Sequence, residues 1–303
     1  MFLNKRYYYF TYTKKREEIS INESLMNFIY EEYHEIFFVN EEKEIMILDN
    51  LTIAETIIEN SLTFIPNTSS DSLIDSDFRI MQRFHHTWYN TLYDYLSSKK
   101  FLNILIQVAK ERKTGVVYPE MDKQLLVFKM PINFINVVLL GLDPYTTGEA
   151  NGFAFATNRK TKPVSLSNIE KGMFSDLKLS KEEYFLRNDL SHLVKQGVLL
   201  LNCSLTVKKG FVKGHLELWK DLIKLVLQTL NNVRDKRLIF IFLGSDAQKN
   251  TKYITSHISL SCEHPAKCAY EEREFYHNNI FSETNMYMLE NKNKEIKWME
   301  KLK

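Results

Sequence analysis

The chain has 303 residues, of which 44% are hydrophobic and 26% charged, and its net charge is only +2. This length fits one domain of more than about 200 residues with a small partner, and the charge lacks the basic excess of a tight nucleic-acid binder. No uncharged apolar run approaches the roughly 18 residues of a membrane span, and the N-terminus lacks a signal-peptide core, so the sequence predicts a cytoplasmic protein without a membrane segment.

Residues 1–78 are predicted to form an accessory α/β module that ends in a linker. Aromatic and β-branched runs predict its strands, and apolar residues at helical spacing predict its helices. The strands are expected at 7–13 and 44–48, the helices at 23–37 and 52–62, and the polar, breaker-rich linker at 66–72. Two interpretations stay open, a packing extension and a protein-interaction or dimerisation module.

Residues 79–303 alternate predicted helices with apolar strands. The helices are expected at 88–96, 101–113, 166–173 and 216–230, and the strands at 136–141, 197–201, 238–243 and around 258–260. Ser165 is a candidate N-cap for the third of these helices. Strands separated by helices predict an α/β fold with a central parallel sheet flanked by helices on both faces.

The three cysteines, Cys203, Cys262 and Cys268, are odd in number and form no Cys-x-x-Cys pair. This pattern fits a reducing compartment and argues against a zinc site. Cys203 follows a buried strand, so we expect it to be an inert packing residue.

Polar residues follow the predicted strands at the points where the apolar runs stop. Asp143 follows the first strand, Asn202 ends the second, Gly244 and Ser245 follow the third, and His264 follows the fourth. In an open parallel sheet, ligands bind outside the carboxyl ends of the strands. An isolated Gly-x-Asp-Pro-Tyr is more often a turn than a site, but the colinear series makes a functional site the better interpretation.

The series resembles the family 1 uracil-DNA glycosylases. Residues 141–146 are similar to that family's Gly-Gln-Asp-Pro-Tyr-His, and 199–202 to its Leu-Leu-Leu-Asn. Residues 243–245 and 264–269 are similar to its Trp-Gly-Ser and His-Pro-Ser-Pro-Leu-Ser. The resemblance covers about residues 85–303 and implies the uracil-DNA glycosylase fold for 79–303, with base-excision repair as the process served.

The resemblance also implies roles for the residues at the strand ends. Asp143 would orient a water and face the oxocarbenium-like sugar, while a neutral His264 would donate to uracil O2. The uracil-binding candidates are Leu142, Tyr145, Phe155 and Asn202. Phe155 would stack on the flipped base, Asn202 would pair with uracil N3–H and O4, and Tyr145 would exclude thymine's methyl group. No metal or organic cofactor is needed.

The segments expected to handle DNA depart from the family's pattern. The candidate DNA-binding residues are Pro119, Pro163, Ser165, Gly244, Ser245, Ala266, Lys267 and Cys268. Cys268 aligns with the family's intercalating leucine, Ala266 with a phosphate-binding serine, and Lys267 with a proline. Leu142 replaces a glutamine and Thr146 a histidine. The other pocket residues are retained, namely Asp143, Tyr145, Phe155, Asn202 and His264.

Three functional interpretations remain. The first is an active glycosylase on uracil-containing DNA, with a preference for single strands where no wedge is needed. The second is a catalytically silent pseudo-glycosylase that binds a protein partner such as a DNA-mimicking glycosylase inhibitor. The third is a glycosylase for a modified pyrimidine. It is disfavoured because the retained Tyr145 would lie against C5 of the base and clash with a substituent there.

Overall fold

The computed structural model describes residues 83–270 and 279–302, together with four short strands nearer the N-terminus. Side chains at 268–270 are outside the described set. Contacts between residues divide the chain into two compact units, Met1–His85 and His86–Lys303. The predicted boundary at residue 78 falls among residues outside the description and stays a prediction.

The N-terminal unit contains two antiparallel hairpins. These are β1 (Tyr7–Phe10) with β2 (Arg16–Ile19), and β3 (Phe37–Val39) with β4 (Ile45–Ile47). β1 and β4 fall within predicted strands. Phe37 was expected to end a helix and instead begins β3, where its pairing with Ile47 outweighs the helical spacing of the residues before it. The rest of the two predicted helices and the linker lie outside the described residues.

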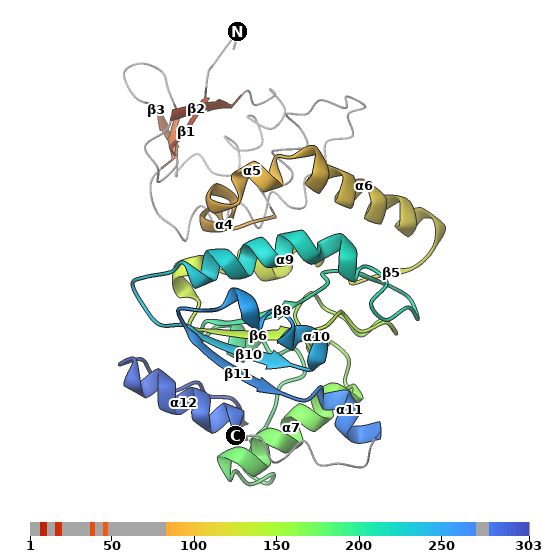
Figure 1. Ribbon diagram of the computed structural model, residues 1–303, viewed down its shortest axis with the longest axis vertical. Coiled ribbons are helices and arrows are strands. Elements are labelled where there is room, and N and C mark those ends of the chain that lie inside the picture. Colours follow the sequence, from red (N-terminus) through yellow and green to blue (C-terminus); the bar gives the residue numbers. More distant parts are fainter. Residues whose placement is uncertain are drawn as a thin grey trace. The chain divides into compact units, whose positions relative to one another are not determined.

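The second unit is built on a four-stranded parallel sheet with the order β11-β10-β6-β8 (Figure 1). Its strands are β6 (Val137–Gly141), β8 (Val198–Asn202), β10 (Ile239–Leu243) and β11 (Ile258–Cys262). All residues of β6, β8 and β10 are buried, as expected for apolar strands covered on both faces. β11, at one edge, alternates buried and exposed residues. The predicted α/β fold is confirmed.

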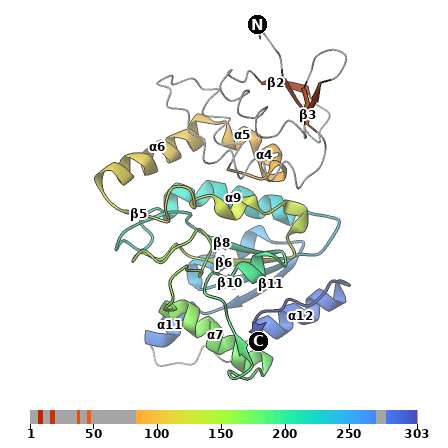
Figure 2. The same cartoon turned by 180° about the vertical axis from the view of Figure 1, so that it is seen from behind.

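Helices cover both faces of this sheet, as the two opposite views show (Figures 1 and 2). On one side lie α9 (Leu216–Asn231) and, beyond it, α4 (His86–Thr91), α5 (Tyr93–Leu96) and α6 (Lys99–Thr114). On the other lie α7 (Val164–Leu177), α11 (Pro265–Tyr270) and α12 (Ile280–Glu290). The apolar residues of α9 that recur at helical spacing are buried, including Trp219 and Leu230.

Shorter elements complete the second unit. Two antiparallel pairs are β5 (Val117–Tyr118) with β9 (Val207–Lys208), and β7 (Tyr184–Phe185) with β12 (Glu300–Lys301). Short helices are α8 (Ser191–Val194), α10 (Ser245–Gln248), η1 (Leu126–Lys129), η2 (Ile132–Phe134) and η3 (Thr251–Tyr253). Within the described part of the chain, no helix is long and apolar enough to cross a membrane.

The start of α7 differs from the prediction. Pro163, not Ser165, is the N-cap, because its backbone is extended while Val164 is already helical. Ser165 lies inside the first turn with only 8% of its surface exposed. The cap makes no side-chain hydrogen bond, since proline has no side-chain acceptor.

Candidate functional site

The strand register brings the predicted site residues to one edge of the sheet. Gly141 pairs with Asn202, and Leu243 pairs with Cys262, so all four strands end at the same level. Asn202 is the last residue of β8, and Asp143, Gly244 and His264 follow closely after the ends of β6, β10 and β11, as the sequence predicted.

The side chains of Asn202 and Phe155 pack against Gly141, at the end of β6. A Cβ atom placed there would lie 2.6 Å from Asn202 Oδ1 and 2.9 Å from Phe155 Cε2. Asn202 and Phe155 are themselves only 7% and 8% exposed. The amide and the aromatic ring therefore meet over the strand end because glycine leaves room for both.

The backbone around Phe155 is held in an unusual conformation. Its φ is +63°, a region that non-glycine residues adopt at a cost of about 1–3 kcal/mol. Its carbonyl accepts a 2.8 Å hydrogen bond from Tyr145 Oη, and Ala154 N donates to Leu200 O at 3.0 Å. These hydrogen bonds hold the backbone at Ala154 and Phe155 beside β8. Burial raises the pKa of Tyr145, with Glu149 adding to the effect, so its hydroxyl stays protonated and able to donate.

Asp143 is partly buried and bound by a backbone amide. Its Oδ2 accepts from Lys213 N at 2.7 Å. Burial raises the pKa of this carboxyl, the Lys213 N–H and positive charge oppose the rise, and the nearby Asp246 adds to it. Lys213 has a φ of +63°, which aims its amide at the carboxylate.

His264 has a defined tautomer in its neutral form. Its Nδ1 accepts from Ala266 N at 3.2 Å, and because a backbone amide only donates, the ring hydrogen is on Nε2. Burial lowers the pKa of His264, which favours the neutral ring, while Asp246 opposes the shift. Its ring centroid is 6.0 Å from that of Phe155.

Gly244 allows this histidine its position. Gly244 has a φ of +95°, and a Cβ there would lie 2.8 Å from the His264 Cβ. The next residue, Ser245, is exposed at the start of α10. Within α10, Asp246 accepts from Lys213 Nζ at 2.6 Å and Lys249 Nζ at 2.7 Å. Burial acts to raise the pKa of Asp246, but these two ammonium groups lower it overall.

The remaining predicted residues differ in how exposed they are and in the hydrogen bonds they accept. Leu142 is partly exposed and its carbonyl accepts from Ser204 N at 2.9 Å. Pro119 is buried, follows a cis peptide bond, and its carbonyl accepts from Arg112 at 2.7 Å. Ala266 is partly exposed and Lys267 exposed, both in α11, and Cys268 belongs to the same helix.

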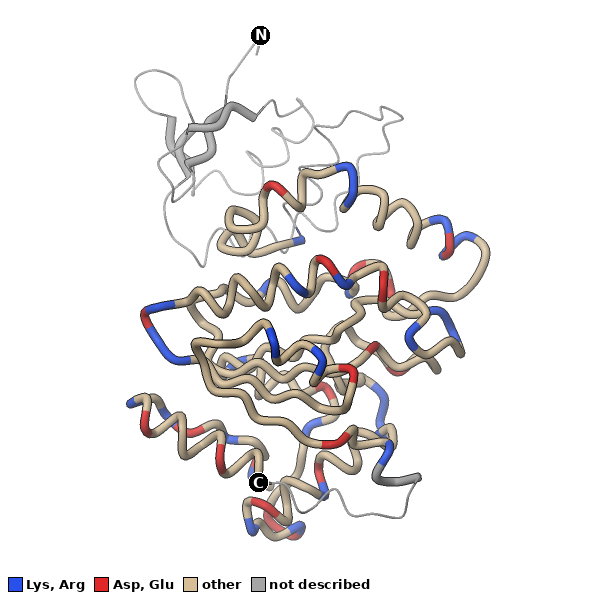
Figure 3. Tube along the Cα trace, viewed as in Figure 1, with Lys and Arg blue, Asp and Glu red and all other residues tan. Residues whose placement is uncertain are grey.

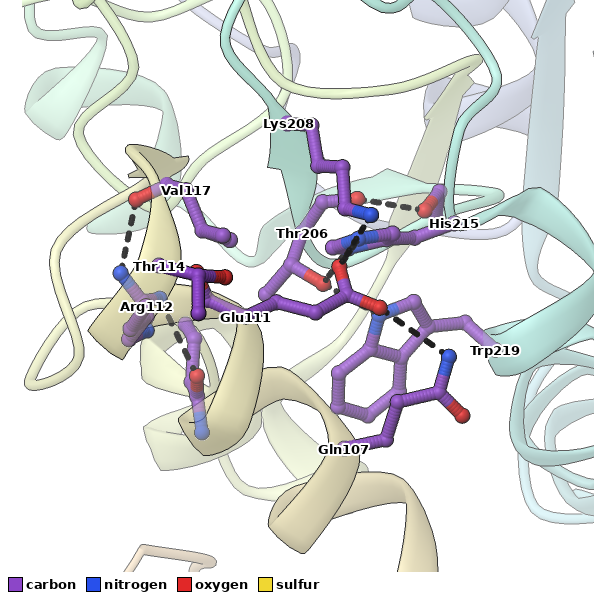
Figure 4. Close-up of polar contacts among 11 residues, drawn as sticks. Gln107, Glu111, Arg112, Thr114, Val117, Thr206, Lys208, His215 and Trp219 are labelled. Carbon is purple, nitrogen blue, oxygen red and sulfur yellow. Dashed lines mark hydrogen bonds and ion pairs between the residues drawn. The ribbon is translucent and has the colours of Figure 1, made fainter.

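A polar network braces the loop that carries Lys213 (Figure 4). His215 Nε2 lies 2.7 Å from Glu111 Oε2, and its Nδ1 lies 2.7 Å from Thr206 Oγ1. Trp219 Nε1 donates to the same Thr206 oxygen at 2.7 Å, and Lys208 Nζ pairs with Glu111 at 3.1 Å. Burial acts to raise the pKa of Glu111, but hydrogen bonds from Gln107, His215 and Lys208 lower it overall.

Sequence reasoning missed the Lys213 amide and the His215 network. Any non-proline residue supplies an amide, so no residue type marks that donor. A histidine immediately before α9, four residues from the buried Trp219, is the only sequence signal of the network. Cys203 is buried as expected, and burial raises the pKa of its thiol to about 12. Among the described side chains, no group of His, Cys, Asp and Glu is arranged to hold a metal ion.

The fold and this edge define a class of protein. Residues 130–289, more than half of the chain, match the family model described as the Uracil DNA glycosylase superfamily. The chain therefore belongs to that superfamily.

Within this superfamily, the chain is similar in sequence to bacterial proteins named as uracil-DNA glycosylases. Over 218 residues the chain is 34% identical to uracil-DNA glycosylase 1 of Listeria monocytogenes, covering 70% of this chain and 96% of that protein. It is 36% identical over 218 residues to the uracil-DNA glycosylase of Buchnera aphidicola, covering 70% of this chain and 97% of that protein. The crystal structure of mimivirus uracil-DNA glycosylase has a TM-score of 0.65 at 17% identity, covering 80% of this chain and 98% of that one. At 17% identity, the similarity to the mimivirus structure shows a shared fold and nothing further.

Proposed function

We propose that this protein is an active uracil-DNA glycosylase, which hydrolyses the bond between uracil and deoxyribose and so initiates base-excision repair. The observation that carries the proposal is the packing of Asn202 and Phe155 on Gly141, at the sheet edge where Asp143 and His264 also lie. Family membership supports the same conclusion.

Recognition of the flipped base is assigned to three side chains. Phe155, fixed by the hydrogen bond from Tyr145 to its carbonyl, stacks on the uracil ring. The Asn202 side chain offers one acceptor and one donor, which match uracil N3–H and O4 and mismatch cytosine. The Tyr145 ring occupies the space that a thymine methyl group needs, and Leu142 completes the wall of the pocket.

Bond cleavage is assigned to Asp143 and His264. The C1′–N1 bond breaks with its electron pair going to uracil N1, while the oxygen of a water bonds to C1′. Asp143 faces the developing cation and receives the water's proton, and the Nε2–H of His264 donates to the oxyanion forming at O2. The tautomer set by Ala266 N supports this role, because the free hydrogen is on Nε2.

Contact with the DNA backbone is proposed for the segments around this edge. Gly244, Ser245 and Lys267 follow the ends of β10 and β11, and Pro163 begins α7. Pro119, Ser165, Ala266 and Cys268 stay proposals for the same surface. Cys268 in place of a leucine is a smaller wedge, which supports a preference for single-stranded DNA.

A DNA-mimicking inhibitor is a proposed protein partner. Structures of mimivirus uracil-DNA glycosylase variants in complex with UGI share the fold of this chain, with TM-scores of 0.65 and 0.64 at 18% identity. An acidic protein would bind the same edge as DNA. The cytoplasmic location stays a prediction from sequence.

The test is uracil release from single-stranded and duplex oligonucleotides. We expect release by the wild type, its loss in Asp143→Asn, and its retention in Asp94→Asn, an exposed carboxylate on α5. No release by a folded wild-type protein would contradict the proposal and support the silent, partner-binding alternative. Titration with UGI then measures partner binding without depending on catalysis.

A further inference from the structure

Two neighbouring apolar side chains are unusually exposed in the loop between β9 and α9. Phe211 is 67% exposed and Val212 61%, the highest values among the large hydrophobic residues in the part of the chain that the structure describes. The backbone around them is fixed, since Phe211 N donates to Lys208 O and Gly214 N donates to Phe211 O, both at 3.0 Å. A paired, rigidly held apolar protrusion marks an interaction site better than scattered exposed residues do.

The segment 208–213, here called the 208–213 loop, contacts the candidate active site at two points. Lys213 N donates to Asp143 Oδ2 at 2.7 Å, and Gly210 N donates to Thr146 O at 3.1 Å. Phe211 and Val212 lie between these two anchor residues. The apolar protrusion is therefore beside the catalytic carboxylate, at the edge where a flipped nucleotide enters.

The loop is braced at both ends before any ligand arrives. Lys208 and His215 both contact Glu111 on α6, at 3.1 Å and 2.7 Å, and these contacts are visible in Figure 4. Lys213 Nζ binds Asp246 at 2.6 Å. A preorganised loop loses little conformational entropy on binding, so its contacts contribute more fully to affinity.

The charges of the loop indicate which partner it fits. Lys208, Lys209 and Lys213 give the loop three positive charges within six residues. Figure 3 shows Lys and Arg in blue and Asp and Glu in red along the trace, with both signs spread over the described part of the chain. Glu111 and Asp246 pair with the first and last of them, and Lys209 makes no ion pair with any described residue. Lysines around an exposed aromatic ring suit a chain of phosphates and flat bases, which is a nucleic-acid strand.

We propose that Phe211 is a stacking platform for the nucleotide next to the flipped uracil, with Val212 beside it and Lys209 contacting the adjoining phosphate. This inference rests on the proposed function and deepens it. In the segment after His264, Cys268 stands in place of the family's leucine wedge. We therefore assign the contact with the neighbouring base to the 208–213 loop.

The experiment compares Phe211→Ala with Phe134→Ala. Phe134 is a matched control because it is 45% exposed and precedes β6, at the opposite end of the sheet. The substrates are a single-stranded oligonucleotide with a central uracil and a deoxyuridine 3′,5′-bisphosphate, which has no neighbouring base. Stacking on an aromatic side chain corresponds to a roughly 5- to 150-fold change in affinity per base.

We expect Phe211→Ala to raise KM for the oligonucleotide by this factor with kcat unchanged, and to leave the bisphosphate unaffected. Phe211→Trp should restore the wild-type KM, and Phe134→Ala should match the wild type. Lys209→Gln should make the negative slope of log affinity against log salt concentration shallower by about 0.7, because one phosphate contact is lost.

An unchanged KM in Phe211→Ala would overturn the inference, as would an equal loss on the bisphosphate or no rescue by tryptophan. If Phe211→Ala alters only self-association in sedimentation, the surface is a protein contact and the inference is wrong. Should the wild type release no uracil, the proposed function fails separately. Fluorescence anisotropy with the same oligonucleotide and variants then decides the inference through binding alone.

Discussion

Replacement of Gly141 by alanine tests how the candidate pocket is built. The added Cβ would lie 2.6 Å from Asn202 Oδ1 and 2.9 Å from Phe155 Cε2, whereas ordinary contacts begin at 3.4 Å. The Asn202 oxygen must therefore retreat by about 0.8 Å, the difference between 2.6 and 3.4 Å. A displacement near 1 Å at a catalytic site costs roughly 100-fold in rate, and overpacking a core costs about 1–3 kcal/mol of stability.

We expect Gly141→Ala to lower kcat/KM for uracil release about 100-fold and the free energy of unfolding in urea by about 1–3 kcal/mol. The control is Gly115→Ala, where the nearest atom to a new Cβ is 3.9 Å away, and it should behave as the wild type. Activity must be measured well below the thermal midpoint of the variant. Wild-type release by a folded Gly141→Ala protein would refute the idea that Gly141 sets the positions of Asn202 and Phe155.

Three further predictions concern charge and stability. Because the folded-state pKa of Asp143 is raised, its ionised form destabilises the fold at neutral pH, so Asp143→Asn should raise the thermal midpoint at pH 7, and the gain should vanish below about pH 4. Burial lowers the pKa of His264, so its ring stays neutral to a lower pH than an ordinary histidine, and any acidic loss of kcat/KM caused by its protonation should fall below about pH 6.5. A loss caused by this histidine at or above that pH would contradict its proposed role as a neutral donor. Asp176 accepts from Phe281 N and Ser282 N at 2.8 and 3.1 Å, so Asp176→Ala should cost about 1–2 kcal/mol in urea unfolding, and an unchanged midpoint would show that α12 needs no such cap.

Much of the sheet could be predicted because its strands differ sharply from their surroundings. The apolar runs of β6, β8 and β10 are buried on both faces, and the alternation of Ile258 and Leu260 marks an edge strand. The parallel register then places the strand ends at one level, which is why Asp143, Asn202 and His264 could be grouped from sequence.

Other features depend on backbone geometry, which residue types do not specify. Ser165 is a good N-cap by composition, but the helix begins at Val164, so the serine lies one position inside the first turn. The hydrogen bond to Asp143 comes from the amide of a residue 70 positions away. The exposure of Phe211 also has no sequence signal, because an aromatic residue near a buried strand is more often packed inside.

The amide hold on Asp143 has a consequence for which substitutions the site tolerates. Since the donor belongs to the main chain, the side chain at position 213 is free to change without loss of that hydrogen bond. Glycine or asparagine would adopt the positive φ more easily than lysine, at the expense of the Asp246 ion pair. Proline alone is barred twice, because it lacks the N–H and its ring fixes φ near −65°. The candidate catalytic carboxylate is thus held by a position at which the backbone conformation matters more than the type of side chain.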